Sequence, residues 1–130
     1  MMLSDSIKTG ISLTLDLLVT ESDTANHYGS GYLDVYATPA MISFMEKTSM
    51  EAVQPFLPKG YGTVGTSVNV RHLRPTAVNT AVSCTSKLIE RENRRLVFNV
   101  IVSDMEGIIG EGTHERFIIE EDKFLRKISR

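Results

Sequence analysis

The sequence predicts a single α+β domain in which an antiparallel sheet of about five strands packs against one long helix. The chain has 130 residues, the usual size of a domain with one core. One segment has the three- and four-residue apolar spacing of a helix, and most of the remaining chain alternates with period two between short turn signals. Strands joined by short connections pair antiparallel, because parallel strands need long crossovers.

The first strand is predicted at residues 11–19. Its apolar side chains occupy every second position: Ile11, Leu13, Leu15, Leu17 and Val19. This alternation is typical of a half-buried strand. Residues 20–31, which read TESDTANHYGSG, are polar and have no apolar period of either kind. We expect a loop there, long enough to form a lid or a binding segment.

A helix is predicted from about Pro39 to Val53. Thr38 precedes the proline, and its hydroxyl is suited to cap a helix whose first turn tolerates a proline without an N–H. Apolar residues follow at three- and four-residue steps: Met41, Ile42, Met45, Ala52, Val53 and Phe56. Two prolines and a glycine shortly after Val53 end the helix.

Four further strands are predicted after Gly62, where period-two alternation continues to Glu120. Residues expected to share a face in the first three are Thr66, Val68, Val70, His72 and Arg74; Val78, Val82, Cys84 and Leu88; and Leu96, Phe98, Val100 and Val102. A last strand is predicted at residues 108–120, with turns at 90–95 and 104–107. The charged residues 121–130 are expected to be a frayed tail, so residues 1–130 form one domain.

Charge and cysteine content disfavour several classes of partner. Fourteen Lys and Arg against sixteen Asp and Glu give a net charge of -2, which provides no overall positive field for nucleic acid or an anionic membrane. The apolar run at 11–19 is too short for a membrane span and too polar for a signal peptide. The single cysteine, Cys84, precludes an intramolecular disulfide and favours a reducing cytoplasm.

Neither a dinucleotide cofactor nor a metal ion is expected, although the chain contains a glycine motif and three histidines. Residues 60–65 read GYGTVG and match the dinucleotide-binding pattern. That pattern requires a strand before the glycines and a helix after them, whereas here a helix is predicted before them and a strand after them. No helix N-terminus therefore faces a pyrophosphate, and the glycines are expected to serve a turn and close backbone approach. The three histidines lack metal-ligand spacing, so no metal site is predicted.

Three polar side chains are candidates for catalysis. On an ideal helix, Thr38 and Glu46 lie about 80° apart around the axis and two turns apart along it, so they line one wall. His72 shares a strand face with Val68, and imidazole is a natural base near neutral pH. The structural alternatives remain open: Thr38 as a helix cap, Glu46 as a charge at the edge of the apolar stripe, and His72 as a hydrogen-bonded core residue.

Three motifs stand out along the chain: ATPAM at 37–41 with Glu46 beyond it, GT at 65–66 with His72 beyond it, and GTHER at 112–116. In these motifs the chain resembles the fluoroacetyl-CoA thioesterase family of hotdog-fold proteins. The resemblance extends from about residue 32 to residue 124. The resemblance implies a curved antiparallel sheet wrapped around one long helix. It also implies a homodimer, or a tetramer, with active sites at the dimer interface.

The resemblance also implies the activity and the roles of the site residues. The family's catalytic residues correspond to Thr38, Glu46 and His72, and its substrate-contacting glycine and arginine to Gly65 and Arg116. We expect an acyl-CoA thioesterase that releases free acid and CoA, needs no cofactor, and acts on a short or small substituted acyl group. Glu46 would be the nucleophile or the base that aims a water, and His72 the general acid and base.

The other two expected roles belong to Thr38 and Gly65. The Thr38 hydroxyl would orient Glu46 or take part in acyl transfer, and the Gly65 N–H would stabilise the oxyanion. Arg116 would supply fixed positive charge near the acyl substituent.

The loop and the surface cations leave the acyl group and the CoA contacts open. Residues 28–32, YGSGY, stand where the family has an aromatic-bearing lid, and Tyr32 is predicted to contact substrate. Candidates for binding the CoA phosphates are Arg71, Arg74, Arg91, Arg94 and Arg95. Two alternative functions remain: a hydratase or dehydratase on the same fold, and a non-catalytic acyl-CoA-binding module. The presence of all three catalytic-type residues favours an enzyme.

Overall fold

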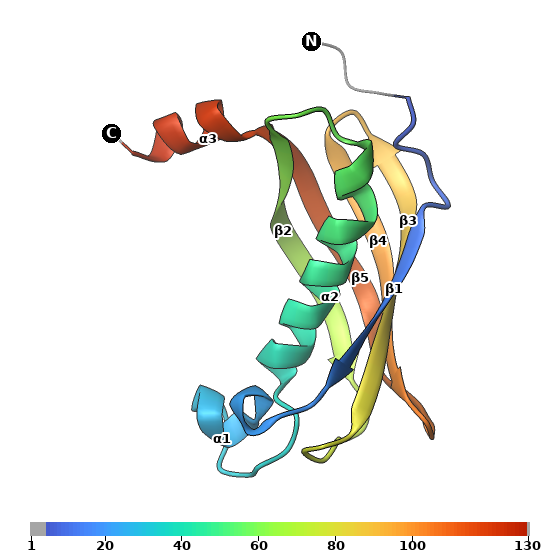
Figure 1. Cartoon of the computed structure of the whole chain (residues 1–130), viewed down its shortest axis with the longest axis vertical. Coiled ribbons are helices and arrows are strands. Elements are labelled where there is room, and N and C mark those ends of the chain that lie inside the picture. The colour runs from blue at the N-terminus through green and yellow to red at the C-terminus, as the bar shows by residue number, and fades with distance from the viewer. Residues whose placement is uncertain (1–4, 130) are drawn as a thin grey trace.

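The computed structural model, which describes residues 5–129, is a five-stranded antiparallel sheet wrapped around one long helix (Figure 1). The strands are β1 (Ser12–Leu18), β2 (Tyr61–His72), β3 (Ala81–Glu92), β4 (Arg95–Asp104) and β5 (Gly107–Glu120). The helices are η1 (Glu21–Asp23), α1 (Ala25–Tyr28), α2 (Thr38–Val53), η2 (Gln54–Phe56) and α3 (Glu121–Ile128). The sheet order β1-β3-β4-β5-β2 leaves β1 and β2 at the edges. The predicted fold class is confirmed.

The core lies between α2 and the inner face of the sheet. The predicted alternation of β4 is confirmed, because Leu96, Phe98, Val100 and Val102 are all fully buried. They face buried residues of α2 that include Ala40, Met41, Phe44, Met45, Ala52 and Val53. Burying a side chain of this size contributes roughly 1.5–3 kcal/mol, so this one interface fixes the position of α2 over the sheet.

The start of α2 differs from the prediction in its cap. The helix begins at Thr38, and its N-cap residue is Ala37, whose side chain makes no capping hydrogen bond. Pro39 lies in the first turn, as expected. The predicted capping role of Thr38 is therefore wrong, and its hydroxyl bonds to another side chain, described below.

Residues 20–31 contain two short helices, which the sequence interpretation as a plain loop missed. The Asp23 carboxylate accepts a hydrogen bond from the Thr20 N–H at 2.8 Å. The Thr24 hydroxyl accepts one from the His27 N–H at 3.1 Å. Local side-chain caps of this kind form a helical turn without any apolar period, so η1 and α1 gave no periodic signal.

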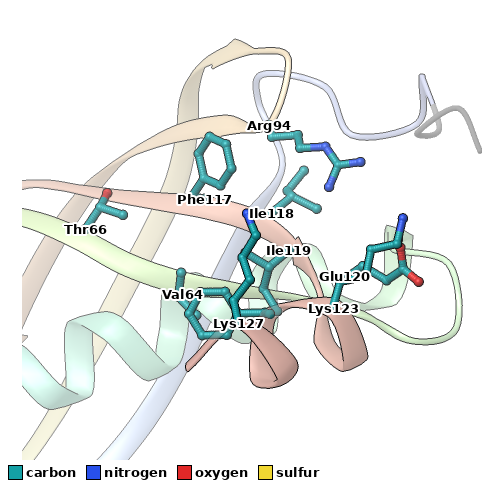
Figure 2. A pocket seen from close by; sticks show the side chains of 10 residues that line it. Val64, Thr66, Arg94, Phe117, Ile118, Ile119, Glu120, Lys123 and Lys127 are labelled. Atoms are coloured by element: carbon teal, nitrogen blue, oxygen red, sulfur yellow. The ribbon is translucent and has the colours of Figure 1, made fainter. Parts of the chain in front are cut away.

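The C-terminal segment is also helical, contrary to the expected frayed end. Helix α3 has Glu121 and Asp122 in its first turn and Arg126 and Lys127 in its last, the arrangement that complements the helix dipole. It packs beside the outer faces of β2 and β5, where a pocket of about 560 Å³ is lined by apolar side chains and cations (Figure 2). This pocket lies on the opposite face of the sheet from α2.

A bulge in β2 places two predicted site residues on the same face of the sheet. Gly65 and His72 are seven residues apart, so strict alternation would point them to opposite faces. The register between β2 and β5 shifts directly after Gly65, and Thr66 is the extra residue. Gly65 then pairs with Arg116, and His72 pairs with Gly110. Gly65 and His72 therefore both face α2. The predicted placement of Thr66 on the His72 face is wrong for the same reason.

A buried hydroxyl pair ties α2 to β3 and predicts a measurable coupling. Ser49 Oγ donates to the Met45 carbonyl at 2.8 Å and lies 2.7 Å from Ser86 Oγ, and both serines are fully buried. Ser49→Ala leaves the Ser86 hydroxyl buried without its partner, which should cost about 1–3 kcal/mol. Because the double change to alanine removes both hydroxyls, it should cost less than the sum of the single changes. Urea unfolding of the four proteins measures this; strict additivity would contradict the coupling.

Candidate active site

Thr38 and His72 form one half of the predicted site. The Thr38 hydroxyl lies 2.8 Å from His72 Nδ1 and joins the first residue of α2 to the last residue of β2. Among the described residues, the other ring nitrogen, Nε2, is buried without a hydrogen-bond partner. Burial lowers the pKa of His72 below its usual value, and the nearby backbone of Arg74 only partly opposes this. The ring is therefore neutral near pH 7 and has one nitrogen left for chemistry.

This pair borders a cavity of about 380 Å³ between the start of α2 and the segment after β2. Its lining includes Val35, Tyr36, Thr38, His72, Leu73 and Pro75. The Tyr36 ring meets the His72 ring edge-on, with 6.3 Å between centroids. Burial raises the pKa of Tyr36, so its phenol stays neutral at the wall of this cavity.

Glu46, Gly65 and Arg116 form the other half of the predicted site. A Cβ atom added to Gly65 would lie 2.8 Å from Glu46 Oε2 and 3.4 Å from Arg116 Nη1. The same position is 3.2 Å from Cε1 of His114. Only a residue without a side chain lets these three groups converge on the strand. Glu46 is half-buried and its carboxylate lies close to Gly65 on β2, which favours a role in the site over that of a boundary charge pointing to water.

Arg116 is a buried cation held in a fixed orientation. Its side chain is 6% exposed. Nε donates to Thr63 Oγ1 at 2.7 Å, Nη2 to the Thr63 carbonyl at 2.9 Å, and Nη1 to His114 Nε2 at 3.1 Å. These contacts use three of its five N–H groups. Burial lowers the pKa of Arg116 and the nearby Glu46 carboxylate opposes this, so the guanidinium stays charged beside the carboxylate.

His114 is a site residue that the sequence analysis did not select. It lies two residues before Arg116 on β5, and both side chains point inward because a strand alternates with period two. The two-residue spacing of His114 and Arg116 on a predicted strand could have indicated that both side chains face the same side of the sheet. An imidazole and a guanidinium on one buried face rarely serve packing alone, because buried polar groups need partners.

The two halves are well separated within one chain. Eight residues of helix separate Thr38 from Glu46, a rise of about 12 Å. The Thr38 hydroxyl contacts His72, so it does not orient Glu46 in the same chain. Tyr32 joins neither half: it is 98% exposed and lines a separate small cavity of the 26–32 loop. Its predicted substrate contact stays a prediction.

The five candidate arginines differ in how they are engaged. Arg74 contacts the Asp104 carboxylate at 2.6 Å, and Arg95 bonds to the carboxylates of Glu90 and Glu115. Arg91 donates to the backbone carbonyls of Ile7 and Asn93. Arg94 lies 5.8 Å from the centre of the Tyr61 ring. The ion pairs of Arg74 and Arg95 make them poorer candidates for phosphate than Arg71 and Arg94.

Residues 5–129 bear on three further expectations, which concern metal ligands, membrane-spanning helices and the single cysteine. No group of three or more His, Cys, Asp or Glu side chains is placed there to hold a metal ion. No helix in this part of the chain is long and apolar enough to cross a membrane. Cys84 is fully buried, and burial raises the pKa of its thiol, which disfavours the nucleophilic thiolate.

Gly65→Ala is expected to disable the Glu46 half while leaving the fold intact. The new Cβ would displace the end of the Glu46 side chain, a group that moves cheaply, and would lie 3.2 Å from Cε1 of the buried His114 ring, so the melting temperature should fall modestly. Activity should fall by about tenfold or more, because displacing a reacting group by 1 Å is costly. Gly62→Ala, on the same strand, is the control, since its Cβ meets only Glu121 at 3.5 Å. Equal activity in both variants would contradict the placement of Glu46.

Comparison with known proteins agrees with this geometry. A model of the fluoroacetyl-CoA-specific thioesterase family matches residues 19–122. A fluoroacetyl-CoA thioesterase from Streptantibioticus cattleyicolor is 33% identical over 132 residues, which cover 97% of this chain and 95% of that protein. The match thus spans both halves of the site.

Solved structures show the same fold. A fluoroacetyl-CoA thioesterase structure superposes with a TM-score of 0.90 at 34% identity and covers 95% of this chain and 96% of its own. A hot-dog-like protein from Thermanaerovibrio acidaminovorans gives a TM-score of 0.85 at 25% identity, with 92% and 89% covered. The resemblance and the hotdog fold predicted from the motifs are confirmed, and the chain belongs to the fluoroacetyl-CoA-specific thioesterase family.

Proposed function

We propose that the protein hydrolyses the thioester of a short or small substituted acyl-CoA to free acid and CoA. The family supports the reaction class. The observation that carries the proposal is the convergence of the Glu46 carboxylate and the Arg116 guanidinium on the exposed backbone at Gly65. A carboxylate beside a strand glycine provides an attacking group next to an N–H that can bind an oxyanion.

We infer that two copies pair through β2 to complete the site. β2 is an edge strand with an open side, and its central Val68 is 42% exposed. Antiparallel pairing about an axis between Val68 and Asn69 sets Gly65 opposite His72 of the partner subunit. Each Glu46 half would then lie beside the partner's Thr38 and His72 half. The 12 Å separation within one chain, set by the helix rise, supports this arrangement.

The chemistry follows from those positions. The thioester carbonyl lies at Gly65, whose N–H stabilises the oxyanion, and Arg116 faces the acyl substituent. Glu46 attacks the carbonyl carbon or aims a water at it. On the water route, the neutral imidazole of the partner's His72 takes a proton from the attacking water and gives it to the CoA sulfur as the C–S bond breaks. On the Glu46 route, the C–S bond breaks as the anhydride forms and CoA leaves as the thiolate; the imidazole then takes a proton from the water that hydrolyses the anhydride and passes it to that thiolate. The hydrogen bond between the His72 ring and the Thr38 hydroxyl of the same subunit fixes the orientation of that ring.

A single turnover in ¹⁸O-labelled water separates the two routes. Attack by Glu46 itself forms an anhydride, and water attack at the Glu46 carbonyl then leaves ¹⁸O in that side chain. Attack by water places ¹⁸O only in the product acid. Mass spectrometry of the digested protein reads the outcome.

Release of free CoA thiol from a panel of acyl-CoAs tests the proposal. The panel spans acetyl, fluoroacetyl, propionyl, 3-hydroxybutyryl and long-chain acyl groups. We expect free thiol and free acid from the small acyl groups. Formation of an enoyl product from the 3-hydroxyacyl-CoA without thiol would show a dehydratase, and tight binding without turnover would show a binding module; either result would overturn the proposal.

The pH dependence of kcat/KM should report His72 as an acid limb. Protonated His72 cannot accept a proton, so activity falls as pH drops through its pKa. Because burial lowers that pKa, the limb should lie below pH 6.5, and activity should be constant from there toward neutrality. Initial rates between pH 4.5 and 8 measure it. An acid limb above pH 6.5 would contradict the buried, neutral ring.

We also infer a reducing compartment, the cytoplasm, as the place of action. The described chain holds one free cysteine, Cys84, which is buried. Cytoplasmic proteins typically keep such thiols reduced, and acyl-CoA substrates occur there. Localisation of a tagged chain in its native host checks this.

A further inference from the structure

The imidazole of His114 lies beside Gly65 on the inner face of the sheet, which is the face that packs against α2. The residue is 1% exposed and belongs to β5. Its ring stacks on Phe98 with 6.4 Å between centroids and 30° between planes. Cε1 is 3.2 Å from the point where a Gly65 Cβ would lie. The ring therefore forms part of the surface against which Gly65 packs.

The hydrogen bonds of the ring determine where its proton lies. Arg116 Nη1 is 3.1 Å from Nε2 of His114, and a guanidinium only donates, so Nε2 is the acceptor. Nδ1 therefore carries the proton and donates to the Ser67 carbonyl at 2.8 Å. Burial, the largest cause, and the Arg116 charge both lower the pKa of His114, against opposing effects of Ser67, Glu46 and Glu115.

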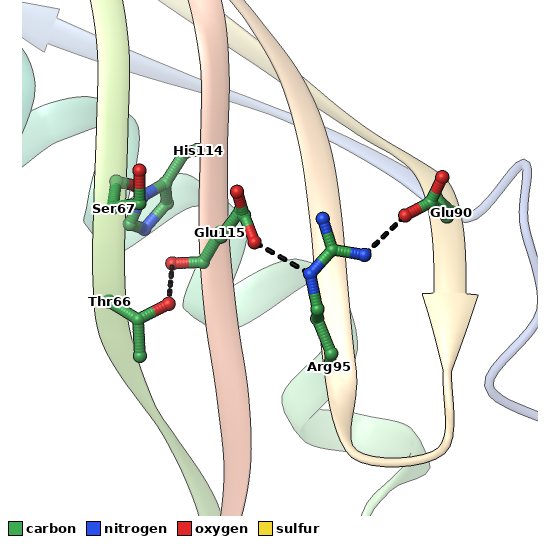
Figure 3. A network of polar contacts seen from close by, with 6 residues as sticks. All are labelled: Thr66, Ser67, Glu90, Arg95, His114 and Glu115. Carbon is green, nitrogen blue, oxygen red and sulfur yellow. Dashed lines mark hydrogen bonds and ion pairs between the residues drawn. The ribbon is translucent and has the colours of Figure 1, made fainter.

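The Ser67 carbonyl belongs to the bulge that turns Gly65 inward. The register of β2 against β5 shifts between Gly65 and Ser67. On the outer face of the sheet, the Thr66 hydroxyl donates to the Glu115 carbonyl at 3.2 Å (Figure 3). On the inner face, the adjacent His114 holds Ser67. Two consecutive residues of β5 thus fix the bulge from both sides.

We propose that His114 is a positioning residue of the active site, with two separate tasks. Its Nδ1–H holds the bulge that points Gly65 at Glu46, and its Nε2 lone pair orients the Arg116 guanidinium. The inference rests on the proposed thioesterase function and deepens it. Neither task requires His114 to contact the substrate or to change protonation state.

Two conservative substitutions separate the tasks. The amide nitrogen of His114→Asn takes the place of Nδ1 and keeps the donor to Ser67, but it leaves Arg116 without its acceptor. We expect kcat close to wild type and a severalfold rise in KM for the preferred acyl-CoA. The amide oxygen of His114→Gln reaches Arg116 but leaves the Ser67 carbonyl unpaired. We expect kcat to fall by about tenfold or more, with KM little changed.

A matched control distinguishes positioning from loss of stability. Val100→Ala, in the buried row of β4, removes core volume at a residue that pairs with Gly112 rather than with His114 or Arg116. It should lower the melting temperature at least as much as either amide variant while keeping kcat. Asn and Gln variants with the same kcat and KM as each other would overturn the two-task assignment, as would a loss no greater than in Val100→Ala. Wild-type protein without thiol release would instead overturn the proposed function.

Discussion

Glu46→Gln should reduce kcat for the preferred acyl-CoA by about a thousandfold. The amide has nearly the same size as the carboxylate, but it neither attacks the thioester carbonyl effectively nor aims the attacking water as a carboxylate does. A catalytic group of this kind contributes on the order of 10²–10⁴-fold. The half-buried side chain faces Gly65 on the inner side of β2, where no other described carboxylate approaches as closely. Steady-state thiol release measures kcat, and circular dichroism checks the fold.

Glu51→Gln is the matched control for that change. Glu51 lies on the same helix and pairs with Lys47 at 3.9 Å on the solvent side. An exposed pair of this kind contributes little, so both activity and stability should stay close to wild type. Substantial turnover in Glu46→Gln, or an equal loss in Glu51→Gln, would remove Glu46 from the mechanism.

His72→Ala should reduce kcat by about a hundredfold or more. It removes the only imidazole that bonds to Thr38 and presents a second, unpartnered nitrogen among the described residues. General acid and base catalysis by a positioned side chain is worth roughly 10²–10⁴-fold. Thr38→Val should cause a smaller loss, because the imidazole remains but loses its orienting hydroxyl. Thiol-release kinetics on both variants measure the difference.

His27→Ala is the control for His72. The His27 side chain is exposed, and its ring meets the Tyr28 ring edge-on in the short helix α1. This change should leave kcat unaltered. If His72→Ala retained wild-type kcat with saturating substrate, the neutral imidazole would have no role in proton transfer.

Much of the fold could be predicted from the sequence because it is built from regular alternation and short turns. The strands around Leu96 and Val100 alternate without interruption, and the residues that the pattern placed inside are buried. The helix from Thr38 to Val53 was equally clear from its spacing and its proline. Helix α1 is stabilised by a local cap and carries no such period, so its segment was expected to be a loop. Helix α3 is a short, highly charged terminal segment, and its charge was interpreted as a frayed end.

The site was harder to predict where it depends on one irregular residue. Counting by twos from His72 puts Gly65 on the wrong face, and only the extra residue Thr66 corrects this. The partner of the Thr38 hydroxyl could not be known either, because it lies 34 residues away on another element. His114 belongs to the GTHER motif but was not selected as a site residue, because its role depends on contacts with Arg116 and Ser67 that the sequence does not show.

A mixed dimer of Glu46→Gln and His72→Ala chains tests most directly whether the site is shared between subunits. Two different affinity tags on co-expressed chains isolate it. One of its two sites then combines the intact Glu46 of one chain with the intact Thr38 and His72 of the other. We predict that thiol release from the preferred acyl-CoA recovers to about half of the wild-type rate per dimer, since one site of two is whole. No recovery above the two parent variants would contradict the shared site.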